Sequence, residues 1–184
     1  DRALRELVAG TSSGAIGVEF LRALVHSVAQ AVGSRFAFVG ELLPGATCVR
    51  TLAVWAGQAF AENFDYELAG TPCEEVVGRE LRVFSDRVQS LFPSDHMLRD
   101  MGAACYAGIS LSDSAGQPLG MLACLDVEPV TSTAIIDSVL PIFAAGAAAE
   151  IERMRGEQSL RRSESTYRDL VEQATYGIYQ SRIA

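Results

Sequence analysis

Apolar residues recur at helical spacing in two segments, one toward each end of the chain. Residues 18–32 place apolar side chains at intervals of three and four, with polar residues between them, and Gly33 ends the pattern. A longer segment begins near Thr131 or Ser132, and Pro141 inside it is expected to bend the helix rather than end it. Both segments are predicted to be amphipathic helices. Their inward residues are Leu21, Leu24, Val25, Val28 and Val32 in the first, and Ile136, Val139, Leu140, Phe143, Ala147, Ile151 and Met154 in the second.

The sequence between these helices is typical of β-strands separated by turns rich in Gly, Pro, Asp and Ser. Residues 119–125 are apolar on both faces, whereas 58–69 is apolar on one face only. The first run is therefore expected at the centre of a sheet and the second nearer an edge, with the two amphipathic helices covering one face. Strands are predicted at 35–43, 48–56, 58–69, 81–84, 105–111 and 119–125, with turns at 44–47 and 113–118.

Three short helices are predicted among the strands. Thr71 is the expected N-cap of the first, with Pro72 at its first position, Glu74 three residues after the cap and Gly78 at its end. Ser85 and Ser94 are the expected caps of the other two. The last of the three is expected to bury Met97, Leu98 and Met101.

The two ends of the chain differ from the middle. Residues 1–16 are predicted to be the tail of an upstream helix and a linker, and the absence of an initiator Met and a signal region suggests a segment of a longer protein. Residues 156–184 begin as a charged connector helix with a thin apolar line. Ser163 is the expected cap of a second helical stretch, and 176–183 is predicted to be a strand.

Composition and charge exclude several functions. The net charge is −8, which disfavours nucleic acid as a partner, and all fifteen basic residues are Arg, which removes chemistry that needs a Lys amine. Four widely spaced cysteines without a CxxC pair suggest reduced thiols and a cytoplasmic protein. No uninterrupted apolar run reaches the roughly 18 residues of a membrane span.

The order of the elements and several stretches of sequence resemble a GAF domain across residues 17–155. The stretch Gly70-Thr71-Pro72-Cys73 is the most specific of them; the others are 36–42, 52–55 and 113–123. The resemblance implies an α+β fold, an α/β/α sandwich whose central antiparallel sheet has five or six strands and helices on both faces. It also implies a small-molecule pocket between the sheet and the short helices, and a homodimer formed by the first and last helices. Residues 163–174 and 176–179 resemble the opening helix and first strand of a PAS domain.

Nine residues are predicted to face this pocket, where they would either contact a ligand or fill a core: Phe38, Trp55, Phe64, Tyr66, Cys73, Val76, Phe84, Met101 and Tyr106. Cys73, Cys105 and Cys124 are expected to pack in the core, and Cys73 is the best candidate for an exception, since a helix N-terminus stabilises a thiolate. His96 is expected on the surface and His26 on the polar side of its helix. The missing Lys argues against the cyclic-nucleotide site of some GAF domains, and no Cys precedes a His, which argues against a covalent bilin.

The sequence therefore predicts a sensory or regulatory module of a bacterial signal-transduction protein, a sensor histidine kinase in particular, with PAS and output domains downstream. Its ligand and cofactor remain unknown from the sequence. One alternative is a dimerisation and relay spacer without a ligand. Another is a small methionine sulfoxide reductase that uses the cysteines. No catalytic triad, metal cluster or phosphate loop is recognisable, so the chain itself is not expected to be an enzyme.

Overall fold

The computed structural model describes residues 15–180, with side chains as far as residue 172. The predicted upstream helix lies outside the described residues. Residues as far as Ile151 form one compact unit, and the helical segment that follows belongs to a second unit. How the chain divides into functional domains stays a prediction.

The compact unit is built on an antiparallel sheet in the order β3-β2-β1-β7-β6-β5, with β4 also paired to β2. Strand β7 lies between β1 and β6, which confirms the central position predicted from its two apolar faces. A Cβ at Gly120 of β7 would lie 2.0 Å from the Gly40 carbonyl oxygen, so this glycine lets the two central strands approach. The strands are β1 (Phe36–Leu42), β2 (Cys48–Ala56), β3 (Ala59–Phe60), β4 (Asp65–Glu67), β5 (Arg82–Phe84), β6 (Cys105–Ser112) and β7 (Pro118–Asp126).

The sheet has seven strands rather than five or six, because the run predicted at 58–69 forms two short strands. Both pair with β2, β3 near its end and β4 near its start. Between the two pairings β2 has an irregularity at Leu52, since Val39 pairs with Ala53 and Gly40 with Thr51. The bulge interrupts the ladder there and divides the edge strand into two.

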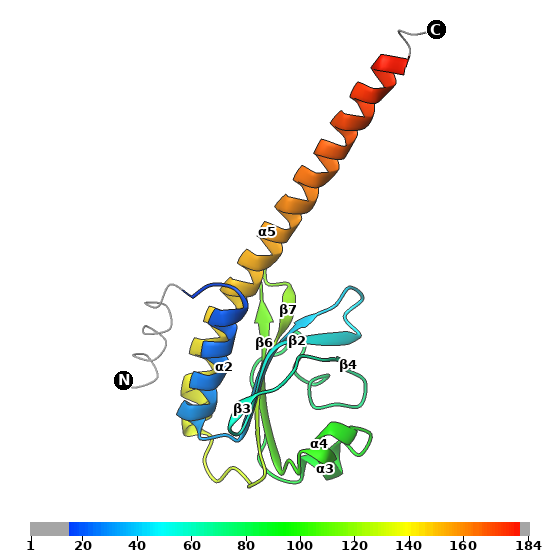
Figure 1. The fold of residues 1–184 in the computed structure, drawn as a ribbon. Helices are drawn as coiled ribbons and strands as arrows, with labels where there is room; N and C mark the ends of the chain where they lie inside the picture. Colours follow the sequence, from blue (N-terminus) through cyan, green and yellow to red (C-terminus); the bar gives the residue numbers. More distant parts are fainter. Residues whose placement is uncertain (1–14, 181–184) are drawn as a thin grey trace. The chain divides into compact units, whose positions relative to one another are not determined.

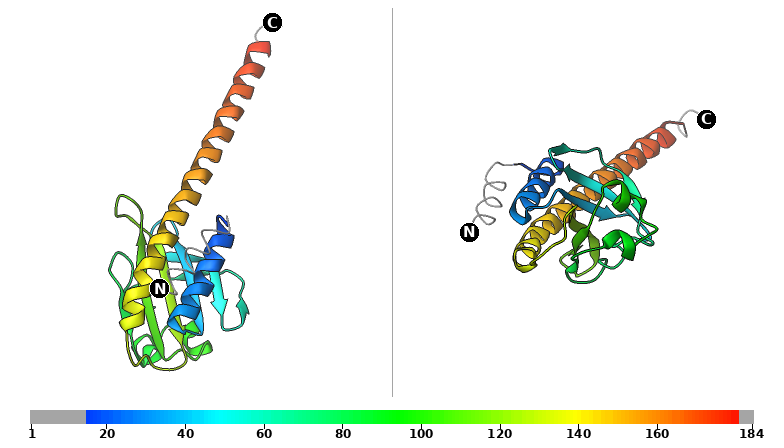
Figure 2. Two further views of the ribbon diagram at one scale, coloured as in Figure 1. Left: turned by 90° about the vertical axis from the view of Figure 1, so that its left-hand side faces the viewer. Right: turned by 90° about the horizontal axis from the view of Figure 1, so that it is seen from below.

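Helix α2 (Val18–Val32) and the part of helix α5 (Ala134–Gln180) that ends at Ile151 cover one face of the sheet (Figures 1 and 2). Gly33 ends α2 in the left-handed conformation that a helix C-cap requires, with φ 76°. The two helices pack together, because a Cβ at Gly146 would lie 3.7 Å from Leu24 Cδ1. Of the predicted inward residues of α5, those from Ile136 to Ile151 are buried, whereas Met154 is half-buried.

The opposite face carries a run of turns at 69–80 and two short helices, α3 (Val88–Leu91) and α4 (His96–Asp100) (Figure 1). The helix predicted after Thr71 is wrong. The Thr71 hydroxyl donates back to the Leu68 carbonyl at 2.7 Å, and the following bonds are short turns, such as Glu74 N to Thr71 O. The carbonyls of Thr71, Pro72 and Val76 each accept at three-residue spacing, so the segment is a series of turns rather than an α-helix.

The predicted caps of the other two helices are also wrong. Arg87 precedes α3 and makes no side-chain cap, and Asp95 caps α4 by accepting from Met97 N and Leu98 N. Ser94 is thus one residue too early, and Asp is an equally good cap. His96 is exposed, as predicted.

Beyond Ile151 the structure corrects two expectations. Helix α5 is continuous from Ala134 to Gln180, through Pro141 and Ser163, so Ser163 is not a cap. Residues 176–180 are helical rather than a strand, and 181–183 lie outside the described residues. A strand needs a neighbour for its hydrogen bonds, whereas a helix satisfies its backbone within its own segment. The relation to a PAS domain stays a prediction.

Helix α5 is also the one helix in the described part of the chain that is long and apolar enough to cross a membrane, over Ala134–Glu172. An 18-residue window of this helix that contains at most two charged residues has a mean hydropathy of 1.7, so the helix meets the criterion without an uninterrupted apolar run. Its inward side lies in the core, where Leu140 and Ala147 are fully buried. A core helix passes the same test of length and composition, so this feature is weak evidence for a span.

Candidate functional site

A cavity of about 270 Å³ lies between the sheet and the segments at 61–73 and 95–101. Its walls are mainly apolar and include five aromatic side chains, which is typical of a small-molecule site, although its volume is at the small end of ligand pockets. It is lined by Phe36, Ala37, Phe38, Val54, Ala56, Ala61, Phe64, Tyr66, Pro72, Cys73, Asp95, Met97, Leu98, Asp100, Met101, Tyr106 and Leu125.

Strand alternation places the sheet residues of this cavity. Phe36 and Phe38 of β1 point toward it, while Val39, the next residue, is fully buried on the helix side. In β2 the bulge at Leu52 resets the alternation, so that Val54 lines the cavity and Trp55 points to the opposite face. The rings of Phe38 and Tyr66 meet edge to face, with centroids 6.2 Å apart.

A thiol between two phenols forms one end of the cavity. The Tyr66 hydroxyl donates to Cys73 Sγ at 3.2 Å, and Tyr106 Oη lies 3.2 Å from the same sulfur. Burial raises the pKa of Cys73 to about 11 and the pKa of both tyrosines above its usual range. All three groups are therefore neutral at physiological pH, and the expectation of a stabilised Cys73 thiolate is wrong because no helix begins there.

Gly108 fixes the position of the second phenol. The Tyr106 ring lies over Gly108, two residues further along β6, and a Cβ there would be 2.3 Å from Tyr106 Oη. The ring is 1% exposed and packs at a centroid distance of 6.1 Å from Phe84. Without a side chain at 108, the ring can lie flat against the strand and direct its hydroxyl to Cys73.

The mouth of the cavity carries two carboxylates. Asp95 Oδ1 accepts from Met97 N at 3.0 Å and from Leu98 N at 3.3 Å, so this oxygen is held at the start of α4. Burial raises the pKa of the half-buried Asp95 carboxyl. Asp100, at the end of α4, is exposed. The cavity thus combines apolar walls, a neutral hydroxyl and thiol cluster, and an acidic edge.

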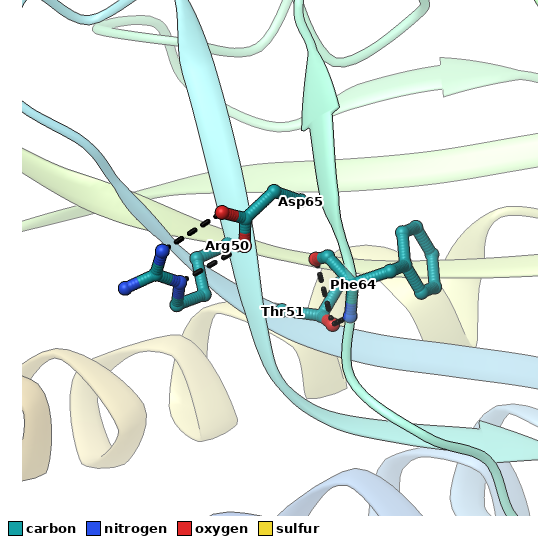
Figure 3. A network of polar contacts seen from close by, with 4 residues as sticks. All are labelled: Arg50, Thr51, Phe64 and Asp65. Atoms are coloured by element: carbon teal, nitrogen blue, oxygen red, sulfur yellow. Dashed lines mark hydrogen bonds and ion pairs between the residues drawn. The ribbon is translucent and has the colours of Figure 1, made fainter.

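The segment that carries Phe64 and Tyr66 is tied to β2 by a buried threonine. Thr51 Oγ1 accepts from Phe64 N at 2.8 Å and donates to Phe64 O at 3.1 Å (Figure 3). Outside it, Arg50 and Asp65 form a two-pronged ion pair at 2.9 and 2.8 Å on the surface. The hydroxyl bonds add to the backbone bond from Thr51 N to Phe64 O at 2.9 Å, and together they hold the Phe64 backbone beside the cavity.

Of the nine residues predicted to face a pocket, six line this cavity: Phe38, Phe64, Tyr66, Cys73, Met101 and Tyr106. Trp55 lies on the helix side of the sheet, with its ring 4.4 Å from that of His26. His26 was expected on the polar side of its helix, but it is half-buried. Val76 is fully buried in the core, and Phe84 packs against Phe92 and Tyr106. The placement predicted for Trp55 is wrong, whereas Val76 and Phe84 fill the core on the cavity side of the sheet without lining the cavity. Ligand contact by the other six stays a prediction.

Several residues that line the cavity were not predicted from the sequence, among them Phe36, Leu125 and Asp95. Phe36 and Leu125 had signals of their own, because alternation from Phe38 and the apolar β7 place them on the same face. No sequence pattern distinguished Asp95 from the other polar residues of its turn. Its position is decided by the folding of 92–96 over the sheet, which no local pattern encodes.

A second cavity, of about 330 Å³, lies on the helix side between the end of α2, β6, β7 and the start of α5. Cys105 and Cys124 line it, and burial raises the pKa of Cys124 to about 12. The sheet separates both thiols from Cys73, so the three cysteines do not form one redox site. Within residues 15–172, no group of three or more His, Cys, Asp or Glu side chains is arranged to hold a metal.

No family model matches the sequence, and no curated protein sequence matches it. Solved structures are similar in fold. The chromophore-binding domain of a bacteriophytochrome from R. palustris has a TM-score of 0.67 at 12% identity, over 85% of this chain and 62% of that one. The GAF domain of an Acinetobacter phosphoenolpyruvate-protein phosphotransferase has a TM-score of 0.66 at 13% identity, over 86% and 98%.

A longer bacteriophytochrome structure from R. palustris gives a TM-score of 0.66 at 12% identity, over 90% of this chain and 40% of that one. The chain thus spans less than two thirds of both bacteriophytochrome structures. At these identities the likeness establishes the fold, and it agrees with the sheet order and the helices on both faces. The described domain has the α+β fold of a GAF domain.

Proposed function

We propose, from the GAF fold as premise, that this chain is a sensory module of a bacterial signal-transduction protein that binds a small molecule in the 270 Å³ cavity. The cavity is the observation that carries the proposal. Aromatic and apolar side chains enclose it, and few polar groups are present to orient a ligand. One neighbour of the same fold is a chromophore-binding domain, which supports a ligand role for such a domain.

The strands provide a route from the cavity to the helices. In β1 and β7, residues that line the cavity alternate with residues buried against α2 and α5, so a ligand that displaces Phe38 or Leu125 also displaces Val39 or Cys124. The Glu150 carboxylate of α5 accepts from Gly17 N at the start of α2. A shift of the sheet would therefore be passed to both helices together, and α5 continues as one helix to Gln180.

Signalling of this kind requires a partner, and we propose a homodimer through α2 and α5. An exposed apolar stripe runs along the outer side of α5, where Ile135 and Ile142 are 55% and 41% exposed and Ala149 is also exposed. These three residues are seven apart, the repeat of a coiled coil. The same spacing separates Leu160 and Tyr167, which are 61% and 72% exposed in the helical segment beyond Ile151.

The dimer is tested by Ile142→Asp, with Ile151→Asp as its contrast. Ile142 is exposed in the single chain, so its variant should remain folded and sediment as a monomer at concentrations where the wild type is a dimer. Ile151 is 1% exposed in the core of its own domain, so its variant should lose stability instead. A wild-type chain that stays monomeric well into the micromolar range removes the dimer from the proposal.

Ligand binding is tested by native mass spectrometry of the purified protein, followed by identification of released small molecules. Val54→Trp should fill the cavity and abolish the bound mass. Gln58→Trp, in the exposed turn after β2, should retain it. If the wild type and both variants carry nothing, and no compound shifts the melting temperature, the ligand-free relay spacer becomes the better account.

The remaining parts of the proposal concern the whole protein. We propose a sensor histidine kinase with a PAS domain after this segment, located in the cytoplasm, and no turnover by this chain alone. The cysteine-based reductase is disfavoured, because the buried Cys73 thiol has a pKa of about 11 and the sheet isolates it from Cys105 and Cys124. Methionine sulfoxide reduction that disappears in Cys73→Ser would reinstate that function.

A further inference from the structure

The chemistry of the cavity also indicates which ligands it accepts, an inference that rests on the proposed function. Among the described residues that line it, the charged ones are Asp95 and Asp100, and none of the fifteen Arg residues is among them. Arg99, which lies between them in α4, directs a guanidinium nitrogen to the Pro93 carbonyl at 3.4 Å. The edge of the cavity therefore has a negative charge that no lining side chain neutralises.

Asp95 has an oxygen available for a ligand. Its Oδ1 atom accepts the two backbone N–H groups that begin α4, whereas Oδ2 has no hydrogen-bond partner among the described residues. The carboxylate is fixed by this cap and half-buried at the cavity. A fixed, partly desolvated carboxylate with a free oxygen favours a cationic partner with N–H donors.

The aromatic side chains of the cavity also favour a cationic ligand. Phe36, Phe38, Phe64 and Tyr66 surround the space, and the Phe64 and Tyr66 centroids are 5.9 Å apart. Ring faces carry negative quadrupole potential and attract organic cations. The phenols and thiol at the far end are neutral, so they add hydrogen bonds but no positive charge to hold an anion.

We infer that the cavity selects a small organic cation, an amine attached to one or two rings, over neutral and anionic molecules of the same shape. The ammonium group would bind Asp95 Oδ2 and the ring would lie among the aromatic side chains. The cavity volume of 270 Å³ equals that of about nine molecules in liquid water, which is room enough for an amine that carries one or two rings. A carboxylate in the same place would be buried beside Asp95 without a counter-charge.

Three indoles that differ only in the end group provide the test by calorimetry: tryptamine, tryptophol and indole-3-acetate, which carry an ammonium, a hydroxyl and a carboxylate. Tryptamine should bind about tenfold more tightly than tryptophol, the usual effect of one charge-assisted hydrogen bond. Indole-3-acetate should give no measurable heat at about 1 mM.

Asp95→Asn is the matched variant, since Asn caps a helix as well as Asp and retains the bonds to Met97 N and Leu98 N. It should remove the advantage of tryptamine and leave tryptophol affinity unchanged. Asp86→Asn removes one exposed carboxylate outside the cavity and should alter neither affinity.

The outcomes separate this inference from the proposed function. Binding of indole-3-acetate as tightly as tryptamine, or a tryptamine advantage that survives in Asp95→Asn, overturns the charge selectivity and leaves a ligand cavity. If the wild type releases a native ligand but binds none of the three indoles, the charge selectivity is overturned and the proposed function remains. No binding together with no native ligand overturns both.

Discussion

The most informative perturbation of this domain is Gly108→Ala, because it tests whether the space over one glycine positions the Tyr106 phenol. A Cβ at 108 would lie 2.3 Å from Tyr106 Oη and 2.8 Å from two ring carbons, where carbon atoms prefer about 3.5–4.0 Å. The ring must therefore move by about 1 Å. It is 1% exposed, so it can move only by displacing Phe84 or Cys73.

The expected cost follows from two terms. Overpacking in a filled core costs about 1–3 kcal/mol, and the lost contact between Tyr106 and Cys73 adds about 1 kcal/mol. Alanine offsets up to about 1 kcal/mol by lowering the entropy of the unfolded chain. The free energy of unfolding should fall by about 1–3 kcal/mol, which lowers the urea midpoint by about 0.5–1.5 M at an m-value near 2 kcal/mol/M.

Urea unfolding followed by the fluorescence of Trp55, the single tryptophan, measures this change. Trp55 lies on the opposite face of the sheet, so the substitution does not touch the reporter. Gly156→Ala, at an exposed helical glycine with no neighbouring atom within 4 Å, should be neutral or stabilising by up to about 1 kcal/mol.

A double-mutant cycle decides the mechanism. In a Tyr106→Leu background the ring is gone, so Gly108→Ala should cost less than about 1 kcal/mol. An equal cost in both backgrounds would refute the reasoning, because the destabilisation would then come from the backbone or another neighbour.

Two further predictions concern the hydrogen bonds between Thr51 and Phe64 and the buried thiols. Thr51→Val should lower the free energy of unfolding by about 1–3 kcal/mol in the same urea assay, because it leaves Phe64 N without its buried acceptor. Asp65→Asn breaks only an exposed ion pair, so it should have a much smaller effect that vanishes in high salt. Equal losses in the two variants would contradict this account. Burial raises the pKa of Cys73 to about 11 and that of Cys124 to about 12. The folded chain therefore retains two protons that the unfolded thiols release above about pH 8.5. The free energy of unfolding should consequently fall as the pH rises from about 9 to 11. A Cys73→Ala/Cys124→Ala variant should show a shallower fall, and a slope unchanged from the wild type would assign the effect to other groups.

Sequence patterns determined the elements that depend on local chemistry. The spacing of Leu21, Leu24 and Val28 identified α2, and the two apolar faces of β7 placed it at the centre of the sheet. The turn at 113–118 followed from Asp113, whose carboxylate accepts from Ala115 N and Gln117 N. These interactions lie within a few residues of each other, so the order of residue types contains them.

The tertiary structure decided the features that depend on distant partners. Trp55 was expected at the pocket, but the bulge at Leu52, which lies in the pairing of β2 with β1, turns it toward His26. Residues 71–78 form turns rather than a helix, and Cys73 is buried between two phenols rather than placed at a helix start. The sequence named Tyr66, Cys73 and Tyr106 as candidates from their residue types. Only the packing of 61–101 over the sheet brought them together with Asp95, since the free energy of that arrangement comes from contacts between residues far apart in the chain.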